Sequence, residues 1–495
     1  MDQTNLDNQT AQNNQNNQNS TNTSSNSLNK ELRGITVTLI FEVSALNRDE
    51  KLGGNIPSIK KLTRFGNKTF SYLSRVAVRH YLFETLCRSY PDDWKPAECF
   101  ESGTGDNKVV QFDLRNQNIL THAELDAFGY MFTIGGQQSL IRKAPVGITK
   151  AIALETWEGD MQFNANHDLA RRCGANPNPV NKEEQMSYFK VSFTIDVDKL
   201  GYDEWWINDY NYSENKLTLF LTEKGTDVVL KNVEKGIDKS HYKIDEHEIR
   251  IEGLTCSVSR ELMEEETENS KNQEKKKSIT FKEDFLKKPE EESKEKESSG
   301  KKGKGKGRKK PFKVEDYTVK EEENFYQFTI ANYSYDSDKK TLTLSLALSH
   351  EIQAQVNGKK YTVISKNFDS EIGEITVEGE NSKKRAIFRL ANEIKKKRLT
   401  QILDVLKNGL IYHSSGECYG IVPKFIIAAG LKLPIPLFHS FVDLGRFEDS
   451  ILDNAYILCE NDKKLVYLYD PEHIVGKICT TNLYTDWKAF SKQIE

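Results

Sequence analysis

The alternation of apolar and polar residues predicts strands and two long helices. In Gly34–Val43, apolar side chains recur at every second position between threonines, as on a strand with one buried face. Tyr188–Val197 repeats this period of two. Helical spacing instead relates the apolar residues of Ser71–Ser89 and of Leu399–Leu410. Ile421–Ala429 is predicted as a buried strand.

Weaker patterns add further strands and complete a mixed architecture. Asp126–Asn164 contains short apolar pieces and paired glycines, which suggest irregular strands and a protruding hairpin. The order of strand, helix, several strands, helix and strand is consistent with an α+β fold. The expected core is RRM-like or ferredoxin-like, with large insertions. The additional strands are predicted at 215–222, 247–258, Phe325–Ile330, Thr341–Leu348, Ala386–Leu390, Ala455–Cys459 and Lys464–Tyr469.

Two segments of biased composition are predicted to be disordered. Residues 1–30 contain 15 Asn or Gln, and residues 261–310 contain 16 Lys or Arg and 13 Asp or Glu. Neither stretch has enough apolar surface to offset the entropy of ordering. We therefore divide the chain into an Asn/Gln-rich tract, two parts of a core and a charged insertion between them. Their expected bounds are 1–30, 31–260, 261–323 and 324–495.

Several classes of protein are excluded by what the sequence lacks. It has no run of about 20 apolar residues that could span a membrane, and no secretory signal. The seven cysteines form no CxxC motif, which indicates reduced thiols and a cytoplasmic protein. Nucleotide-binding glycine motifs, a nucleophile elbow and paired histidines are also missing. We therefore expect no metal, no cofactor and no enzyme activity.

A basic segment points to nucleic acid. Residues 48–80 contain eight Lys or Arg against Asp49 and Glu50, although the whole chain has a net charge of −4. Arg75 and Arg79 are four residues apart, so on a helix they share one face and suit phosphate contacts. His80 is expected to be a satisfied core histidine. The alternative for the whole segment is a solvated charged surface, and a second basic cluster at 381–400 allows the same two interpretations.

Several ordered blocks of the chain resemble a known family. They are GITVTLIFEVSALNRDEK with NIPSIKKL, then YLSRVAVRHYLFETL, APVGITKAIALETWEGDMQFN, and RLTQILDVLKNGLIYHSSGECYGIVPKFIIAAGLKLPIPLFHSFVD. Together they span roughly Gly34–Lys199 and Arg385–Val442. The chain resembles the backbone subunit of the type I CRISPR Cascade complex, the Cas-seven group of DevR type found in type I-B systems.

The resemblance implies an RRM-like core with an inserted web domain and a thumb. It implies copies that polymerise head to tail along a guide RNA, together with other Cascade subunits, and that present the guide for pairing with target DNA. It also implies no cleavage by this subunit. The residues that it places at the RNA are Asn47, Arg48, Lys51, Lys60, Lys61, Arg64, Ser74, Arg75, Arg79, Arg142, Lys143, Lys150, Ser414, Ser415 and Gly416.

Two alternatives remain at this point. Type III relatives of the family cleave RNA with an Asp in the loop after the first strand, where Asp49 and Glu50 lie here. A metal-dependent ribonuclease is therefore one alternative. The other is a stand-alone RRM-like regulator that binds RNA as a monomer.

Overall fold

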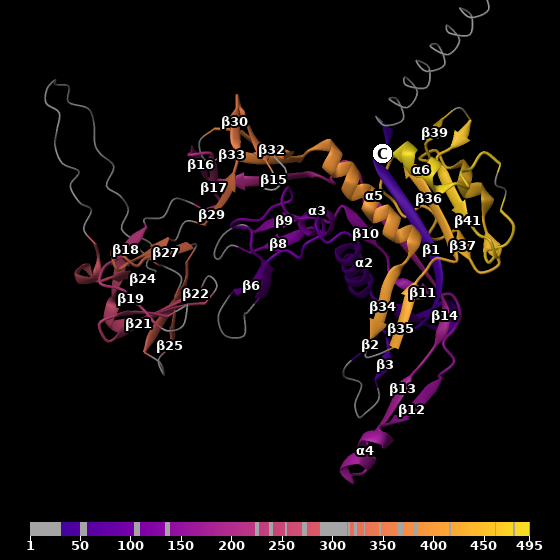
Figure 1. The fold of residues 1–495 in the computed structure, drawn as a ribbon, viewed down its shortest axis with the longest axis horizontal. Coiled ribbons are helices and arrows are strands. Elements are labelled where there is room, and N and C mark those ends of the chain that lie inside the picture. Colours follow the sequence, from indigo (N-terminus) through magenta and orange to yellow (C-terminus); the bar gives the residue numbers. More distant parts are fainter. Residues whose placement is uncertain are drawn as a thin grey trace, which may run out of the picture.

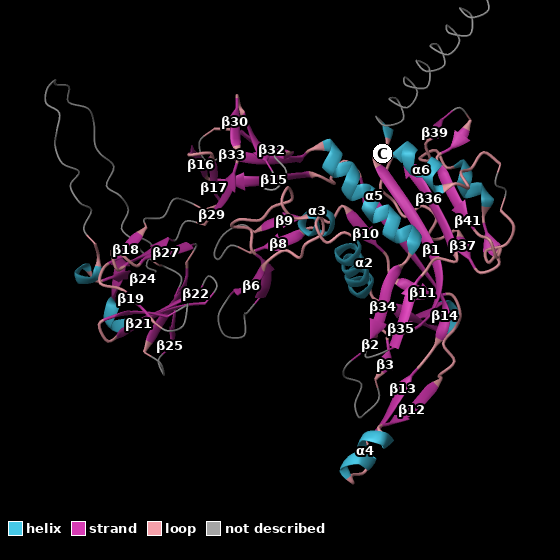
Figure 2. Cartoon of the chain, viewed as in Figure 1, coloured by secondary structure: helices cyan, strands magenta, loops and turns pink. Residues whose placement is uncertain are grey.

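A computed structural model shows a chain built mainly from strands, with few helices (Figure 2). Buried apolar side chains form a core around a central sheet and two further clusters farther along the molecule (Figure 1). The predicted Asn/Gln-rich tract lies outside the described residues. The structure describes residues 31–49, 57–102, 109–133, 139–222, 227–236, 241–252, 255–269, 275–287, 314, 317–320, 324–330, 332–345, 348–364, 370–380, 384–414, 417–460, 462–478 and 481–494.

The central sheet is antiparallel and has β1 in its middle. Successive neighbours are β4 (Lys61–Arg64), β5 (Lys68–Leu73), β11 (Ala151–Ala153), β14 (Met186–Asp196), β1 (Gly34–Ser44), β36 (Phe425–Leu431) and β41 (Val466–Tyr469), and β10 (Val146–Ile148) also pairs with β14. β1 pairs with β14 along its whole length and with β36 on its other side. The strands predicted from clear alternation are therefore the ones that form the centre of the fold.

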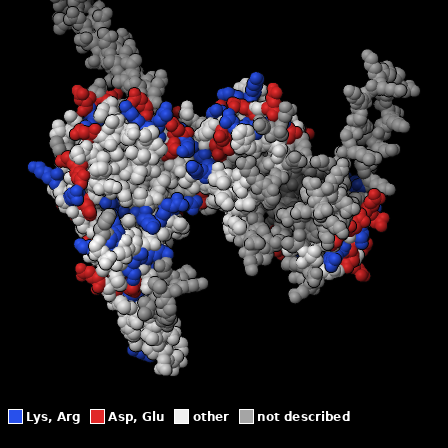
Figure 3. Space-filling view, turned by 180° about the vertical axis from the view of Figure 1, so that it is seen from behind, with Lys and Arg blue, Asp and Glu red and all other residues white. Residues whose placement is uncertain are grey.

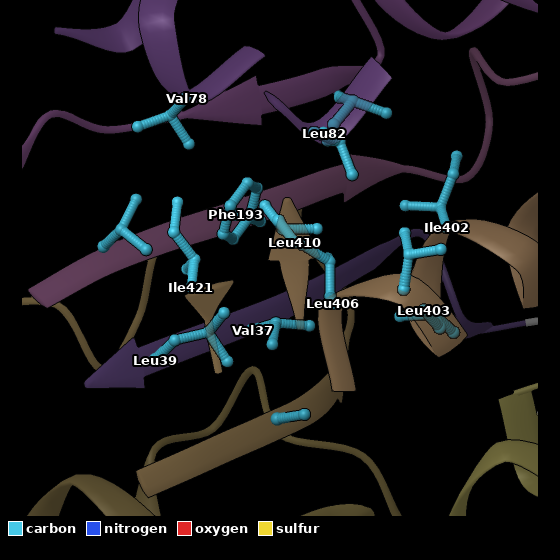
Figure 4. Close-up of a cluster of buried hydrophobic side chains, with 14 of the residues drawn as sticks. Val37, Leu39, Val78, Leu82, Phe193, Ile402, Leu403, Leu406, Leu410 and Ile421 are labelled. Carbon is cyan, nitrogen blue, oxygen red and sulfur yellow. The ribbon is translucent and has the colours of Figure 1, made fainter. Parts of the chain in front are cut away.

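Two helices, α2 (Arg75–Ser89) and α5 (Asn392–Asn408), cover one face of this sheet. Figure 4 shows Val78 and Leu82 of α2 and Leu406 of α5 facing Val37 and Phe193 of the sheet. Burying several such side chains, at roughly 1.5–3 kcal/mol each, stabilises the contact.

The prediction for the first helix was partly wrong. Residues 71–73 belong to β5, because Ser71 and Leu73 alternate with half-buried neighbours along a strand. The buried stripe of α2 runs through Val78, Leu82 and Leu86, and His80 is exposed, with Nε2 3.6 Å from Glu84. It is therefore not a core histidine.

The C-terminal segment covers part of the opposite face of the sheet. Ile40 and Ile427 pack there against Phe438 and Ile451. This segment contains β37 (Val442–Asp443), β38 (Arg446–Phe447), β39 (Cys459–Glu460) and β40 (Lys463–Lys464). The last helix, α6 (Trp487–Ile494), instead packs against Tyr467 of β41.

A second cluster of buried residues surrounds Trp205 and Phe388, whose ring centroids lie 4.6 Å apart. Its main sheet has the order β15 (Tyr202–Ile207), β33 (Lys384–Leu390), β32 (Glu371–Glu378), β31 (Lys360–Ile364) and β30 (Gln355–Asn357). Its other elements are β16 (Asp209–Ser213), β17 (Lys216–Phe220), β29 (Ser349–Gln353), β6 (Cys99–Ser102), β7 (Val109–Phe112), β8 (Tyr130–Phe132), β9 (Leu140–Arg142) and α3 (Ala123–Phe128).

A third cluster forms a separate small β-body at one end of the molecule (Figure 1). Its sheets comprise β18 (Val228–Leu230), β19 (Glu234–Lys235), β20 (His241–Ile244), β21 (His247–Glu252), β22 (Thr255–Ser259), β25 (Tyr317–Lys320), β26 (Phe325–Thr329), β27 (Asn332–Asp336) and β28 (Thr341–Ser345). The hairpin of β23 (Met263–Asn269) and β24 (Lys275–Phe281) joins them. This corrects the prediction of disorder throughout 261–323, because Ile279 and Phe281 are buried in this cluster.

Three hairpins project from the lower end of the core (Figure 1). The longest, which we call the protrusion, comprises β12 (Met161–Ala165), α4 (His167–Cys173) and β13 (Pro179–Glu183). The second pairs β2 (Arg48–Asp49) with β3 (Ser58–Ile59), and the third pairs β34 (Leu410–Ser414) with β35 (Glu417–Ile421). Of the protrusion, only β12 overlaps the 126–164 region where a hairpin was expected, but the hairpin of β8 and β9 lies wholly within that region.

A buried ionic centre joins the core to the second cluster. Asp126 of α3 is fully buried and lies 2.8 Å from the guanidinium of Arg142 on β9 and 2.8 Å from that of Arg398 on α5. Both arginine side chains are also buried. Because one carboxylate satisfies two cations from different elements, its removal would leave uncompensated charge in the interior.

We expect Asp126→Asn to lower the free energy of unfolding by about 3–5 kcal/mol, the range for breaking a buried ion pair. Urea unfolding monitored by tryptophan fluorescence measures this change. The matched control is Asp168→Asn in α4, where both partners of the Asp168–Arg172 pair are exposed. The control should leave unfolding almost unchanged, and equal effects of the two substitutions would contradict the role of the ionic centre.

Candidate nucleic-acid interface

The start of α2 is fixed by hydrogen bonds to the loop after β1. Ser74 caps the helix: its Oγ accepts a hydrogen bond from the Ala77 amide at 3.2 Å. The Ser74 amide in turn donates to Asn47 Oδ1 at 2.8 Å. The loop is also tied to the third hairpin, since the Leu46 amide donates to the Tyr412 hydroxyl at 2.6 Å. Burial raises the pKa of Tyr412, which keeps this hydroxyl neutral.

The two arginines predicted to act together on α2 have different surroundings. Arg75, the first residue of the helix, is exposed beside the positive end of the helix dipole. Arg79 is half-buried, and its guanidinium donates to Glu124 Oε1 at 3.1 Å and lies 4.7 Å from the ring centre of Phe128. Arg75 is therefore available to a phosphate, whereas Arg79 holds α2 against α3.

Arg48 and Lys61 lie at the base of the protrusion, and both donate hydrogen bonds to Glu183. Both carboxylate oxygens of Glu183 accept from Lys61 Nζ at 2.6 Å, and one of them accepts from the Ile59 amide. Lys61 Nζ also lies 3.9 Å from the ring centre of Trp157. The Arg48 guanidinium reaches the Glu183 carbonyl at 3.4 Å, and its Nε is buried without a partner in the described structure. These two cations orient the protrusion relative to the core.

A stretch of sheet beside these residues combines cations with aromatic rings. On β4 and β5, Arg64 lies over Phe70 at 5.9 Å. Lys150, which precedes β11, lies over Tyr72 at 4.9 Å. Arg64 and Lys150 are exposed and both rings are half-buried. We call this surface, which also carries Lys60 and Lys68, the open sheet face. Viewed from behind, Lys and Arg gather on the body above the protrusion (Figure 3).

The cross-strand register shows where the open sheet face ends. Tyr72, Ile152, Lys190 and Ile40 form one row from β5 to β1. Lys190 is already buried, and its Nζ donates to the Val442 carbonyl at 2.5 Å. The pKa of Lys190 is lowered, chiefly by burial. The C-terminal segment therefore closes the sheet at β14 and leaves β4, β5 and β11 accessible.

The residues predicted in the loops lie at the third hairpin or outside the described residues. Ser414 ends β34, and Lys51, Ser415 and Gly416 lie outside the described residues. Glu417, the first residue of β35, pairs with Lys182 of the protrusion at 3.1 Å. The third hairpin thus contacts the protrusion.

Arg142 and Lys143 are not part of this surface. Arg142 is buried in the ionic centre and also donates to the carbonyl of Tyr202. Arg142 is therefore not available to RNA, because its guanidinium is buried and paired with Asp126 inside the protein. Lys143 is exposed, but it lines a groove next to β15 rather than the start of α2.

Sequence reasoning missed Phe70 and Tyr72. The segment 68–73 alternates, so the signal for a strand with two aromatic side chains on one face was present. It was hidden because residues 71–73 were assigned to the helix.

Within the described ranges, no three His, Cys, Asp or Glu side chains converge to hold a metal ion. The same residues contain no helix long and apolar enough to cross a membrane.

An α+β body with exposed cations beside a helix start and aromatic rings is typical of proteins that bind nucleic acid. Comparison with known proteins gives the family. The model described as "CRISPR-associated negative auto-regulator DevR/Csa2" matches residues 35–454, and the chain therefore belongs to this family. This confirms the resemblance at the level of the family.

The chain is also similar to a curated protein. It is 28% identical over 177 residues to the "CRISPR-associated protein Cas7/Cst2/DevR" of Myxococcus xanthus (strain DK1622). The match covers 32% of this chain and 55% of that protein. The chain thus spans about half the length of the relative.

We expect Ser74→Ala to destabilise the protein by about 1 kcal/mol, because it removes the cap of α2. Ser74→Asp should retain most of the stability, since a carboxylate also caps a helix and suits its dipole. Thermal unfolding measured by calorimetry compares the two variants. Equal destabilisation by Ala and Asp would show that the hydroxyl does not act as a cap.

Proposed function

We propose that the chain is the guide-RNA-binding backbone subunit of a type I-B CRISPR surveillance complex. Copies polymerise head to tail along the guide RNA, contact other Cascade subunits and present the guide for pairing with invading DNA. Membership of the DevR/Csa2 family supports this function. A head-to-tail contact uses different surfaces on its two sides, so it builds a filament around the RNA rather than a closed dimer.

We also propose that the core is RRM-like. Along the chain, β1, α2, β11, β14, α5 and β36 follow the order strand, helix, strand, strand, helix, strand. In space these strands are ordered β11, β14, β1, β36, with both helices on one face. A βαββαβ unit gives such an arrangement.

The observation that carries the proposal is the grouping of Asn47, Arg75, Arg64 and Lys150 around the start of α2 and the open sheet face. A guide-binding subunit must accept any spacer sequence, so it should hold phosphates and leave base edges free. Cations that approach the aromatic rings suit a backbone or a stacked base without reading sequence. We propose no catalytic role for Asp49 or for any other residue of this interface.

The description of the family model favours a second candidate, a stand-alone RNA-binding regulator. Native mass measurement of the protein co-expressed with a CRISPR array, with sequencing of bound RNA, distinguishes the two. A multi-copy particle that carries repeat–spacer RNA is expected for the backbone subunit. A monomer that binds RNA one to one would favour the regulator.

We expect the double substitution Arg64→Ala and Arg75→Ala to weaken binding of single-stranded RNA equally for unrelated sequences. Each lost phosphate contact should reduce the slope of log affinity against log salt concentration by about 0.7. Fluorescence anisotropy at several salt concentrations measures both quantities. The matched control is Lys488→Ala on α6, an exposed cation away from the interface.

Ser74→Asp provides an independent test of the same surface. It retains a helix cap but places a negative charge beside Arg75, so it should weaken RNA binding without loss of stability. Unchanged affinity and salt slope in both the double variant and Ser74→Asp would rule out this interface.

A further inference from the structure

A groove lies between β9 and β15, within the second cluster and separate from the proposed RNA interface. Its volume is about 750 Å³, within the range of binding clefts. Residues 139–143 form one wall, and Tyr202–Asn208 form most of the other. In Figure 1, β9 and β15 run close to each other beside α3.

Both walls are strand edges without a neighbouring strand in the described structure. β15 is the outermost strand of its five-stranded sheet, and β9 pairs only with β8. Gly201 accepts from the Leu390 amide on the β33 side, whereas the carbonyl of the next residue, Tyr202, accepts from Arg142 on the β9 side. Because backbone groups alternate along an antiparallel strand, the N–H and C=O of Trp206 also face the groove.

Large apolar side chains stand at this groove and beside it. Trp206 is 56% exposed and Ile141 68% exposed, and Met131, which pairs with Ile141 across the β8–β9 hairpin, is 58% exposed. Natural proteins normally protect strand edges with charges, proline or bulges. An edge flanked instead by exposed Trp and Ile is typical of a surface that another chain covers.

The charge of the groove favours an acidic occupant. Lys143 and Lys199 line it. Lys199 Nζ pairs with Asp196 at 2.8 Å, whereas Lys143 has no ion pair among the described residues. The carboxylates that line it are satisfied within the protein. Asp203 accepts from the Tyr130 hydroxyl at 2.5 Å, and Glu204 pairs with Arg385 at 3.0 Å.

A polypeptide fits these features better than a nucleic acid does. Bases would meet the aliphatic side chains of Ile141 and Met131, which offer no ring for stacking. A peptide strand can instead use the outward-facing backbone groups of Trp206, the apolar rim and Lys143 together.

We propose that the groove binds an extended segment of a partner protein, in which apolar residues alternate with Asp or Glu, as an added strand along β15. Main-chain hydrogen bonds to Trp206 provide the pairing, and the Trp206 and Ile141 side chains hold alternate apolar residues. Lys143, which has no ion pair among the described residues, selects acidic over basic segments, and Lys199 lies beside it with Asp196. This site does not depend on RNA binding, so it goes beyond the function proposed above.

The test uses the full chain and a blocked octapeptide that alternates valine and glutamate. Hydrogen–deuterium exchange should show peptide-dependent protection of the amides of β15, and isothermal calorimetry gives the affinity. The same octapeptide with lysine in place of glutamate should bind about tenfold or more weakly, because like charges would meet at the groove. Trp206→Ala should also reduce binding.

Charge reversal provides the sharpest comparison. Lys143→Glu with Lys199→Glu should reverse the preference, so that the lysine octapeptide binds more tightly than the glutamate octapeptide. The matched control, Lys488→Glu with Lys492→Glu on α6, should keep the original preference. Exchange of the β15 amides unaffected by either peptide would overturn the proposal. The proposal would also be overturned if the groove bound an oligothymidylate instead of the peptide, and if the Lys143 and Lys199 substitutions abolished that binding.

Discussion

The packing of this protein depends on one buried carboxylate. Asp126 accepts hydrogen bonds from Arg142 on β9, from Arg398 on α5 and, through Oδ1, from the Gly201 amide at 2.8 Å. Arg398 in turn donates to the carbonyls of Ile119 and Leu120. An unpaired charge in this interior would cost several kcal/mol, so α3, β9 and α5 are favoured to pack where all three meet at Asp126. That arrangement sets how the second cluster meets the core.

The elements that cover the central sheet determine where a ligand can reach it. α2 and α5 occupy one face, and the C-terminal segment occupies much of the other. His439 belongs to this C-terminal segment, and its Nδ1 lies 2.9 Å from Ser192 Oγ on β14. Burial, with Lys190 and Arg64 nearby, lowers the pKa of His439 to about 4. The neutral ring therefore adds no further charge to that end of the sheet, and the exposed cations remain at β4, β5 and the start of α2.

The parts of the fold that sequence could predict are those set by local patterning. β1 and β14 have unbroken periods, and each forms close to its expected bounds. α5 was found, but it begins at Asn392 rather than Leu399, and Leu410 already belongs to β34. The start of α2 was predicted too early, because the apolar residues near 71–73 fit both the helical period and the strand period of two. The hairpin within 261–323 was missed because two buried residues, Ile279 and Phe281, are diluted by charged neighbours.

In the candidate site, the sequence could predict which residues are basic but not which of them are available to a ligand. Arg75 and Arg79 look equivalent in the chain, yet the availability of Arg79 depends on Glu124, 45 residues away. Arg142 likewise depends on Asp126, which lies on another element. A cation already bonded to a buried carboxylate has little left to offer a phosphate. Counting basic residues therefore overstates a nucleic-acid surface, and the partners of each cation, set by tertiary packing, decide which ones can contribute.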